Sequence, residues 1–229
     1  MKYYSTNNKA LRVSFKDALF SGMPEDKGPY MPEDIPNLSN YFKGNNNFSF
    51  QEIGYLIASK FINKELSIND LHEIIENSIT FDAPNKYIYD SIFYLELFHG
   101  PTLAFKDFGA RFMARTMKKA VSQNNRELNI LVATSGDTGS AVAHGFYGIE
   151  GINVIILYPS QKVSYIQEKQ LTTLDKNIYA LEIQGTFDDC QKLVKKAFLD
   201  VKLNKNLNLS SANSINIARL IPQSFYYFN

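Results

Sequence analysis

The feature that most constrains the fold is a regular alternation of strand-like and helix-like segments from about residue 85 onward. Short runs rich in β-branched and aromatic residues alternate there with amphipathic stretches long enough to form helices. Parallel neighbouring strands need a crossover connection, which is usually a helix. The alternation therefore predicts an α/β fold with a parallel sheet covered by helices.

The individual elements can be placed approximately from the same pattern. We expect strands at 92–97, 130–133, 154–158, 178–183 and 207–209. Helices are expected between them, at 107–121, 140–147, 165–174 and 187–199. A last helix is expected at 214–228, still running at Asn229, although Pro222 should break its regular hydrogen bonding. No later segment covers its apolar residues, which suggests a fragment; the alternative is a terminal helix docked on its own domain.

The first part of the chain has a different pattern, which predicts a small, mainly helical N-terminal domain over 1–84 and a second domain over 85–229. Ser49 and Glu52 form a capping-box signature, followed by apolar residues at helical spacing, which predicts a helix over 50–62.

A second helix of this domain is expected to begin at Ser67, three residues before Asp70. The many Pro and Gly residues over 22–36 predict a loop, and the polar cluster at 44–47 predicts a turn.

Composition narrows the classes of function. Lys and Arg number 24 and Asp and Glu 23, a net charge of +1, which argues against a nucleic-acid or membrane-surface partner. No signal peptide or membrane-spanning run is evident. The single cysteine, Cys190, excludes an internal disulfide framework and indicates a cytoplasmic protein. His72, His99 and His144 lack metal-ligand spacing, so no metal site is expected.

The first candidate for chemistry is Lys106, which lies among apolar residues at an expected helix start, just after His-Gly-Pro. An apolar neighbourhood favours the neutral amine that a Schiff-base lysine needs. A lysine beside Asp107 is, however, more often an ordinary solvated helix residue.

The second candidate is the loop between the strand at 130–133 and the next helix. Backbone N–H groups at such a helix N-terminus favour a carboxylate or phosphate. The alternative is an ordinary turn in which Thr138 or Ser140 caps the helix. The loop matches neither the nucleoside-triphosphate nor the dinucleotide fingerprint.

Further candidates follow two other expected strands. Lys162 and Ser164 come after the strand at 154–158, and Asn213 comes after the strand at 207–209. The carboxyl ends of parallel strands meet at one edge of the sheet, where ligands usually bind. Each of these residues is more often a surface charge, a helix cap or a turn residue.

Together, these motifs closely resemble threonine synthase, in order as well as in spacing. The resemblance lies in V-S-F-K-D-A (13–18), L-E-L-F-H-G-P-T-L-A-F-K-D-F-G-A-R-F (95–112), A-T-S-G-D-T-G-S-A-V-A-H (133–144), I-L-Y-P-S-Q-K-V-S (156–164) and S-A-N-S-I-N-I-A-R-L (211–220). It implies a pyridoxal 5'-phosphate enzyme of fold type II, the fold of the tryptophan synthase β chain. By the same resemblance, Lys106 matches the lysine that holds the cofactor as a Schiff base.

The family resemblance also implies a reaction and roles for the other candidates. The substrate would be O-phospho-L-homoserine, which loses phosphate from its γ carbon and gains water at its β carbon to give L-threonine. Asn213 would lie near the cofactor, and Lys162 and Ser164 would contact the substrate phosphate. The substrate carboxylate would bind to the loop formed by Ser135, Gly136, Asp137, Thr138 and Gly139.

The chain departs from the family in one respect, because threonine synthases of this type are about twice as long. The missing part carries the loop for the cofactor phosphate, so we expect this chain alone to bind the cofactor poorly. Two alternatives remain open at this point: a related lyase such as threonine dehydratase, and a noncatalytic anion-binding module. The oligomeric state is not predicted.

Overall fold

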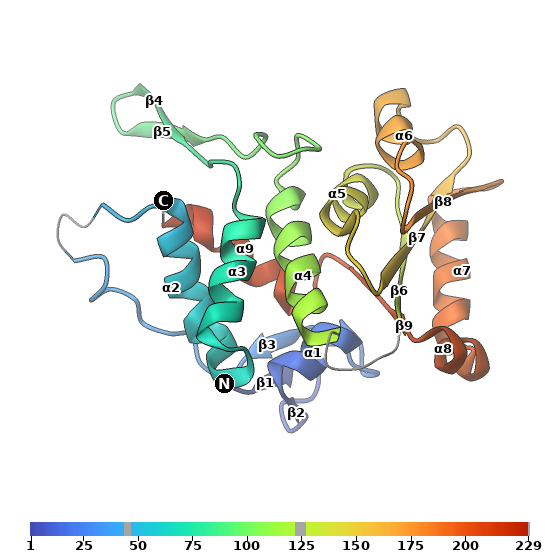
Figure 1. Ribbon diagram of the computed structural model, residues 1–229, viewed down its shortest axis with the longest axis horizontal. Coiled ribbons are helices and arrows are strands. Elements are labelled where there is room, and N and C mark those ends of the chain that lie inside the picture. Colours follow the sequence, from blue (N-terminus) through green and yellow to red (C-terminus); the bar gives the residue numbers. More distant parts are fainter. Residues whose placement is uncertain (44–46, 122–126, 229) are drawn as a thin grey trace.

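The structure is a computed structural model that describes residues 1–43, 47–121 and 127–228. Residues 44–46 of the expected turn, and Asn229, lie outside the described residues. A parallel sheet stands at one side of the molecule, and α5, α4, α3 and α2 follow it outward as successive layers (Figure 1). A smaller sheet closes the base of these helices. None of the described helices is both long and apolar enough to cross a bilayer.

The order of elements confirms the expected alternation in the second part of the chain. The α-helices are α1 (Phe15–Ser21), α2 (Phe50–Ile62), α3 (Ile68–Ser78), α4 (Lys106–Val121), α5 (Asp137–Phe146), α6 (Tyr165–Thr172), α7 (Phe187–Leu199), α8 (Val201–Leu207) and α9 (Ile217–Gln223). The strands are β1 (Tyr3–Ser5), β2 (Arg12–Val13), β3 (Tyr30–Pro32), β4 (Asn85–Tyr89), β5 (Ile92–Leu95), β6 (Leu128–Ala133), β7 (Ile152–Pro159), β8 (Ile178–Ile183) and β9 (Leu209–Ser210). Short 3-10 helices follow α2 and α9.

The parallel sheet has the strand order β8-β7-β6-β9, and every neighbouring pair is parallel. Its two faces follow from the alternation of side chains along each strand. Ile130 and Val132 of β6 belong to the main core, whereas Leu131 packs with Cys190 of α7 on the other face. Helices α5 and α7 therefore lie on opposite faces of the sheet, as Figure 1 shows. The expected fold class, a helix-covered parallel sheet, is confirmed.

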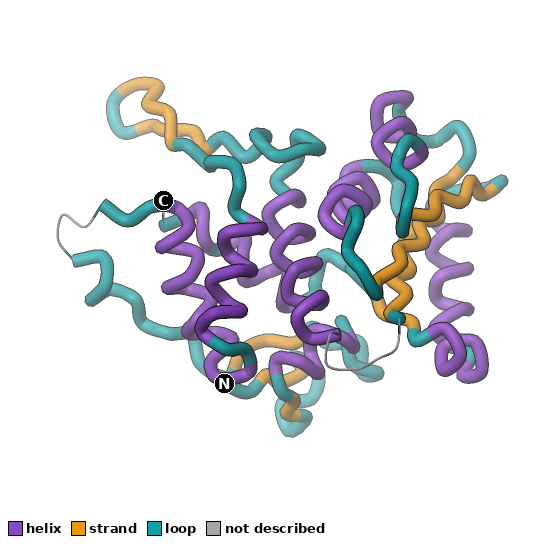
Figure 2. The backbone as a smooth tube through the Cα atoms, in the orientation of Figure 1, coloured by secondary structure: helices purple, strands orange, loops and turns teal. Residues whose placement is uncertain are grey.

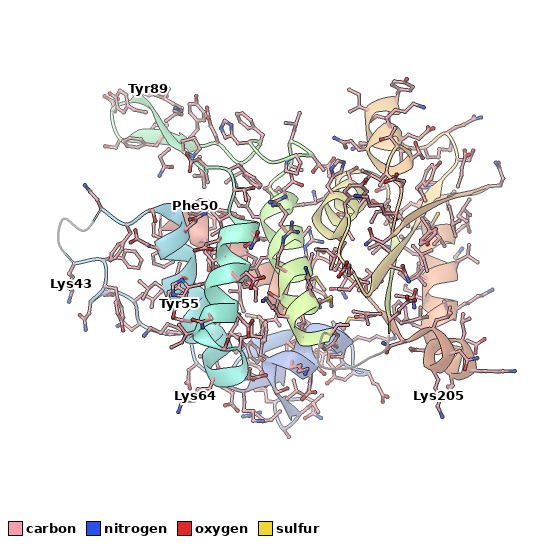
Figure 3. The ribbon with its side chains drawn as sticks, in the orientation of Figure 1. Lys43, Phe50, Tyr55, Lys64, Tyr89 and Lys205 are labelled. Atoms are coloured by element: carbon pink, nitrogen blue, oxygen red, sulfur yellow. The ribbon has the colours of Figure 1, made fainter. Side chains whose placement is uncertain are left out.

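One expected strand of this sheet lies elsewhere. The segment at 92–97 forms β5 over Ile92–Leu95, and β5 pairs antiparallel with β4 in a separate two-stranded hairpin. Only two residues, Asp90 and Ser91, join the two strands, and so short a connection permits only antiparallel pairing. Figure 2 shows the hairpin standing apart from the helices, joined to α4 by a long loop. Tyr89 lies at the outer end of the hairpin in Figure 3 and is exposed.

The N-terminal part contains a sheet that the sequence pattern did not predict. Strands β2, β1 and β3 form an antiparallel sheet, so the expectation of a loop throughout 22–36 is wrong at β3. The partner of β3 is β1, which lies more than twenty residues earlier, beyond the reach of a local pattern. Tyr3 of β1 is fully buried, and its hydroxyl donates to the Phe61 carbonyl at 2.7 Å. This bond joins the sheet to α2.

The C-terminal helix is shorter and better covered than expected. Helix α9 ends at Gln223, one residue after Pro222, and a 3-10 helix follows. Ile217, Ile221 and Phe225 are buried, with exposed fractions of 3%, 4% and 1%. The expectation that this segment lacks a covering element is therefore wrong, because it packs against α2 and α4. The last helix is therefore docked on the rest of the described chain.

Candidate functional site

The largest group of predicted site residues lines one cavity at the carboxyl end of β6. The cavity has a volume of about 480 Å³ and lies between the start of α4, the β6–α5 loop, α6, α7 and the segment after β9. Its lining consists of Lys106, Leu131, Val132, Ala133, Thr134, Ser135, Gly136, Asp137, Thr138, Gln167, Phe187, Gln191, Val194, Lys195, Ser211, Asn213 and Ser214. A concave site of this size is typical of small-molecule binding.

Lys106 is the first residue of α4 and brings its amine to this cavity. Its Nζ lies 3.5 Å from Oδ2 of Asp137, the first residue of α5. Its apolar surroundings are less complete than the sequence suggested. Leu103 and Phe105 are exposed, and the Phe105 ring lies beneath the ammonium group at 4.7 Å. The amine is therefore half-buried beside a carboxylate, and it remains accessible from the cavity.

As expected, the β6–α5 loop places the N-terminus of α5 at the cavity, but the residue that caps this helix differs from the expected one. Neither Thr138 nor Ser140 caps α5; the N-cap is Gly136, which has no side chain to supply a hydrogen bond. Instead, Oγ1 of Thr134 accepts from the backbone N–H groups of Gly136 at 3.1 Å and Gly139 at 2.9 Å. This fixes the loop from its buried side. Anions are stabilised at such a helix start because backbone N–H groups and the helix dipole converge there.

Gln167 of α6 also lines the cavity and is not among the residues predicted from the sequence. Its Nε2 donates to Oδ1 of Asp137 at 2.8 Å, while its Oε1 accepts from the N–H and hydroxyl of Ser164. The spacing of Ser164 and Gln167 is a capping-box signature, so the bond between these two residues could have been predicted. The contact with Asp137 could not, because α5 and α6 meet only in the folded chain.

The remaining predicted residues differ in their positions. Asn213 lines the cavity, and its Oδ1 is a buried oxygen with no hydrogen-bond donor among the residues the structure describes. Lys162 and Ser164 are exposed and do not belong to the lining. Ser164 is the N-cap of α6. The fold thus brings Lys106, the β6–α5 loop and Asn213 together, but leaves Lys162 and Ser164 outside.

Helix α7 forms a wall of the cavity, and its residues are not among the predicted site residues either. Phe187, Gln191 and Lys195 face the cavity from successive turns of this helix. Their spacing of four residues places them on one side of α7. Lys195 and Lys106 supply positive charge and Asp137 negative charge, so the lining suits a ligand that carries anionic groups.

Comparison with known protein families gives two adjacent matches. A family described as "Threonine synthase N terminus" matches residues 2–79, and one described as "Pyridoxal-phosphate dependent enzyme" matches residues 82–219. Among curated proteins, the chain is 48% identical to a threonine synthase of Buchnera aphidicola subsp. Schizaphis graminum and 44% identical to one of Escherichia coli. Each alignment covers 100% of this chain and 53% of the relative. The chain thus spans about half the length of the curated relatives it matches.

Solved structures give the same relationship. The crystal structure of threonine synthase from Escherichia coli matches with a TM-score of 0.87 and 43% identity, over 100% of this chain and 53% of that one. The pyridoxal-phosphate-bound threonine synthase from Brucella melitensis matches with a TM-score of 0.92 and 37% identity, over 100% of this chain and 51% of that one. These likenesses extend to the whole described fold.

Proposed function

This chain belongs to the pyridoxal-phosphate-dependent enzyme family and corresponds to the N-terminal half of threonine synthases, and from this premise we propose that it forms the lysine-bearing part of a threonine synthase. The proposed reaction converts O-phospho-L-homoserine and water to L-threonine and phosphate. One observation carries the proposal: the Lys106 amine and the N-terminus of α5 lie at the same cavity, with Nζ 3.5 Å from the first residue of that helix.

The residues of the cavity fit pyridoxal phosphate. Lys106 offers an accessible primary amine, which would hold the cofactor covalently. Asn213 offers a buried carbonyl oxygen that lacks a donor within the described part of the chain, as expected of a side chain that binds a ligand. When bound, the cofactor supplies an electron sink for the carbanions of the substrate.

The β6–α5 loop would bind the substrate carboxylate. Its backbone N–H groups belong to the first turn of α5, and Thr134 holds the loop in place from below. A carboxylate at this position gains charge-assisted hydrogen bonds and the favourable end of the helix dipole. This would place the α carbon of the substrate on the side of the cavity where Lys106 begins α4.

Lys106 would also move protons. As a free amine it would take a proton from the α carbon of the substrate and exchange protons at the β carbon. Asp137 would hold the lysine when it is an ammonium ion, and Gln167 would orient that carboxylate by its 2.8 Å hydrogen bond. These two residues therefore keep the Lys106 side chain directed into the cavity.

Three further parts of the proposal rest on the sequence. The contact of Lys162 and Ser164 with the substrate phosphate remains a prediction, and so does the division into domains over 1–84 and 85–229. A reducing, cytoplasmic location is supported by the single cysteine, whose thiol is buried in α7.

Covalent trapping tests the proposal. The full-length protein is incubated with pyridoxal phosphate, reduced with borohydride, digested and examined by mass spectrometry. We expect the cofactor on Lys106, and Lys106→Arg should abolish both this label and threonine formation in the full-length protein. Lys118, on the same helix, is the matched control, and Lys118→Arg should change neither. Labelling of another lysine instead, or 2-oxobutyrate in place of threonine from O-phosphohomoserine, would contradict the assignment.

A further inference from the structure

The residue after Lys106 is a buried carboxylate that the proposed reaction does not use. Asp107 is fully buried; its Oδ2 accepts from the Thr102 backbone N–H at 2.9 Å and its Oδ1 from the Thr102 hydroxyl at 2.6 Å. A Cβ atom at Gly100 would lie 2.4 Å from Oδ2, so the loop can approach the carboxylate only because residue 100 is glycine. Asp107 thus holds the loop that precedes Lys106.

This loop includes a residue with unfavourable backbone geometry. Leu103 has a φ of 58°, which lies in the left-handed region that side chains other than glycine rarely adopt, and its side chain is 71% exposed. Its own packing therefore does not explain the conformation. Such a conformation persists only where the surroundings impose it. The two hydrogen bonds from Thr102 to Asp107 supply that constraint.

A buried arginine on α9 lies close to the same turn of α4. Arg219 is fully buried, and a Cβ atom at Gly109 would lie 3.2 Å from its Nε. Its Nη1 donates to the Ala212 carbonyl at 3.1 Å, immediately before Asn213. Its Nε and Nη2 have no hydrogen-bond partner in the described part of the protein. Arg219 thus holds the second segment that lines the cavity.

The two buried side chains influence each other electrostatically. Burial lowers the pKa of Arg219 to about 10, and the negative charge of Asp107 opposes this shift. No hydrogen bond or ion pair joins them among the described residues; the geometric link is the packing of Arg219 against Gly109, two residues after Asp107 on α4. Removing Arg219 takes away part of the compensation of the Asp107 charge, which also acts on Arg111 and His144. Such a loss costs more inside the protein than at its surface.

We propose that Asp107 and Arg219 are coupled positioning residues that hold Lys106 and Asn213 at the same cavity. Asp107 fixes the loop that leads into Lys106, and Arg219 fixes the backbone before Asn213. The close packing of Arg219 against Gly109, on the same turn of α4 as Asp107, joins the two supports, and their opposite charges strengthen this link. The catalytic interpretation of this pair rests on the proposed function. The structural coupling does not, and it can be measured separately.

Hydrogen exchange measures the coupling without cofactor. Backbone amide exchange is followed by mass spectrometry in the parent chain, in Asp107→Asn, in Arg219→Met and in the double variant. We expect each single variant to accelerate exchange on the order of tenfold in both 100–106 and 211–216, and the double variant to add little to either. Exchange in α8 should stay unchanged. The proposal would be overturned if each variant accelerated exchange only in its own segment, or if the effects of the two single variants added in full in the double variant.

A second readout connects the pair to Lys106. The rate at which pyridoxal phosphate attaches to Lys106, trapped by borohydride, should fall about tenfold in Arg219→Met and recover in large part in Arg219→Lys, which keeps the charge. If Arg219 only filled space, Met and Lys would replace it equally well, and that result would overturn the proposal. If the full-length parent protein does not attach the cofactor at Lys106, the proposed function fails, while the exchange experiment still decides the coupling.

Two milder variants keep the test decisive if a charge-removing variant does not fold. Thr102→Val removes only the hydroxyl donor to Asp107 and should accelerate exchange in 100–106 while leaving 211–216 unchanged. Arg219→Lys should keep both segments near the parent rate. Unchanged exchange at 100–106 in both Thr102→Val and Asp107→Asn would show that Asp107 does not hold this loop and would overturn the proposal.

Discussion

At the residue scale, the anion-binding loop depends on backbone positions that leave no room for a side chain. Gly136 has a φ of 155°, and a Cβ atom there would lie 2.6 Å from Nε2 of Gln167. At Gly139 a Cβ atom would lie 2.3 Å from Cγ2 of Thr134. Both glycines therefore let a neighbouring side chain approach the loop. The sequence identified the loop, but the close approach of Gln167 required the folded structure.

The first prediction concerns Gly136. Gly136→Ala should lower the free energy of unfolding by about 1–3 kcal/mol. Alanine would be held at a φ that is unfavourable for it, and its Cβ would clash with Gln167. It should also weaken attachment of the cofactor at Lys106, since the displaced Gln167 no longer orients Asp137. Urea denaturation and borohydride trapping measure the two effects.

Gly148→Ala is the matched control for this experiment. Gly148 also has a positive φ, of 70°, but a Cβ atom there would meet nothing within 4 Å. The control should lose only about 1 kcal/mol, from backbone strain, and should label Lys106 at the parent rate. Equal losses of labelling in both variants would contradict the role given to Gln167.

At the element scale, helices α2, α6 and α7 begin at the residues that the sequence predicted. Helix α7 begins with a complete capping box, in which the Thr186 hydroxyl accepts from the Asp189 N–H and the Asp189 carboxylate accepts from the Thr186 N–H. These hydrogen bonds, first that from the Thr186 backbone, lower the pKa of Asp189 from 3.8 to about 2. The cap is therefore a local interaction that depends on pH.

The second prediction follows from that lowered pKa. A carboxyl group with a lower pKa in the folded state stabilises the fold above its unfolded pKa of 3.8, and loses this contribution as pH falls toward 2. Thr186→Ala should raise the pKa of Asp189 in an NMR titration and flatten the fall in stability between pH 4 and 2. Asp188→Asn, which changes a carboxylate outside the cap, should leave the pKa of Asp189 nearly unchanged. An unaltered Asp189 titration in Thr186→Ala would contradict this account.

At the scale of the whole molecule, the main hydrophobic core runs through both proposed domains. It includes Ile57 of α2, Phe112 of α4, Val154 of β7 and Phe225 after α9. The Phe112 and Phe225 rings pack edge to face with centroids 5.7 Å apart. The C-terminal segment therefore contributes to the same core as the layer of helices beside the sheet.

The third prediction tests this contribution. Phe225→Ala should lower the free energy of unfolding by about 3–5 kcal/mol, because it leaves a cavity in a well-packed core. Phe228→Ala, at a side chain that is 40% exposed, should cost much less. Chemical denaturation of both variants provides the comparison. A small effect of Phe225→Ala would show that the end of the chain is not docked as described.

The sequence by itself determined the local features of this protein. Helices α2 and α7 and strand β8 have the expected limits, because caps and periodic apolar residues act within a few positions of the chain. The sequence likewise indicated the β6–α5 loop, because the carboxyl end of a parallel strand is where ligands usually bind. It indicated Lys106 by its apolar neighbours and by the resemblance to threonine synthase.

Only the tertiary structure decided which distant segments meet. The hairpin of β4 and β5, the pairing of β3 with β1, and the cover over α9 all depend on partners that no local pattern identifies. The same holds for Gln167 beside Asp137 and for Arg219 beneath the site. The physical reason is that hydrogen bonds, charges and packing act over a few ångströms in space, whatever the separation along the chain.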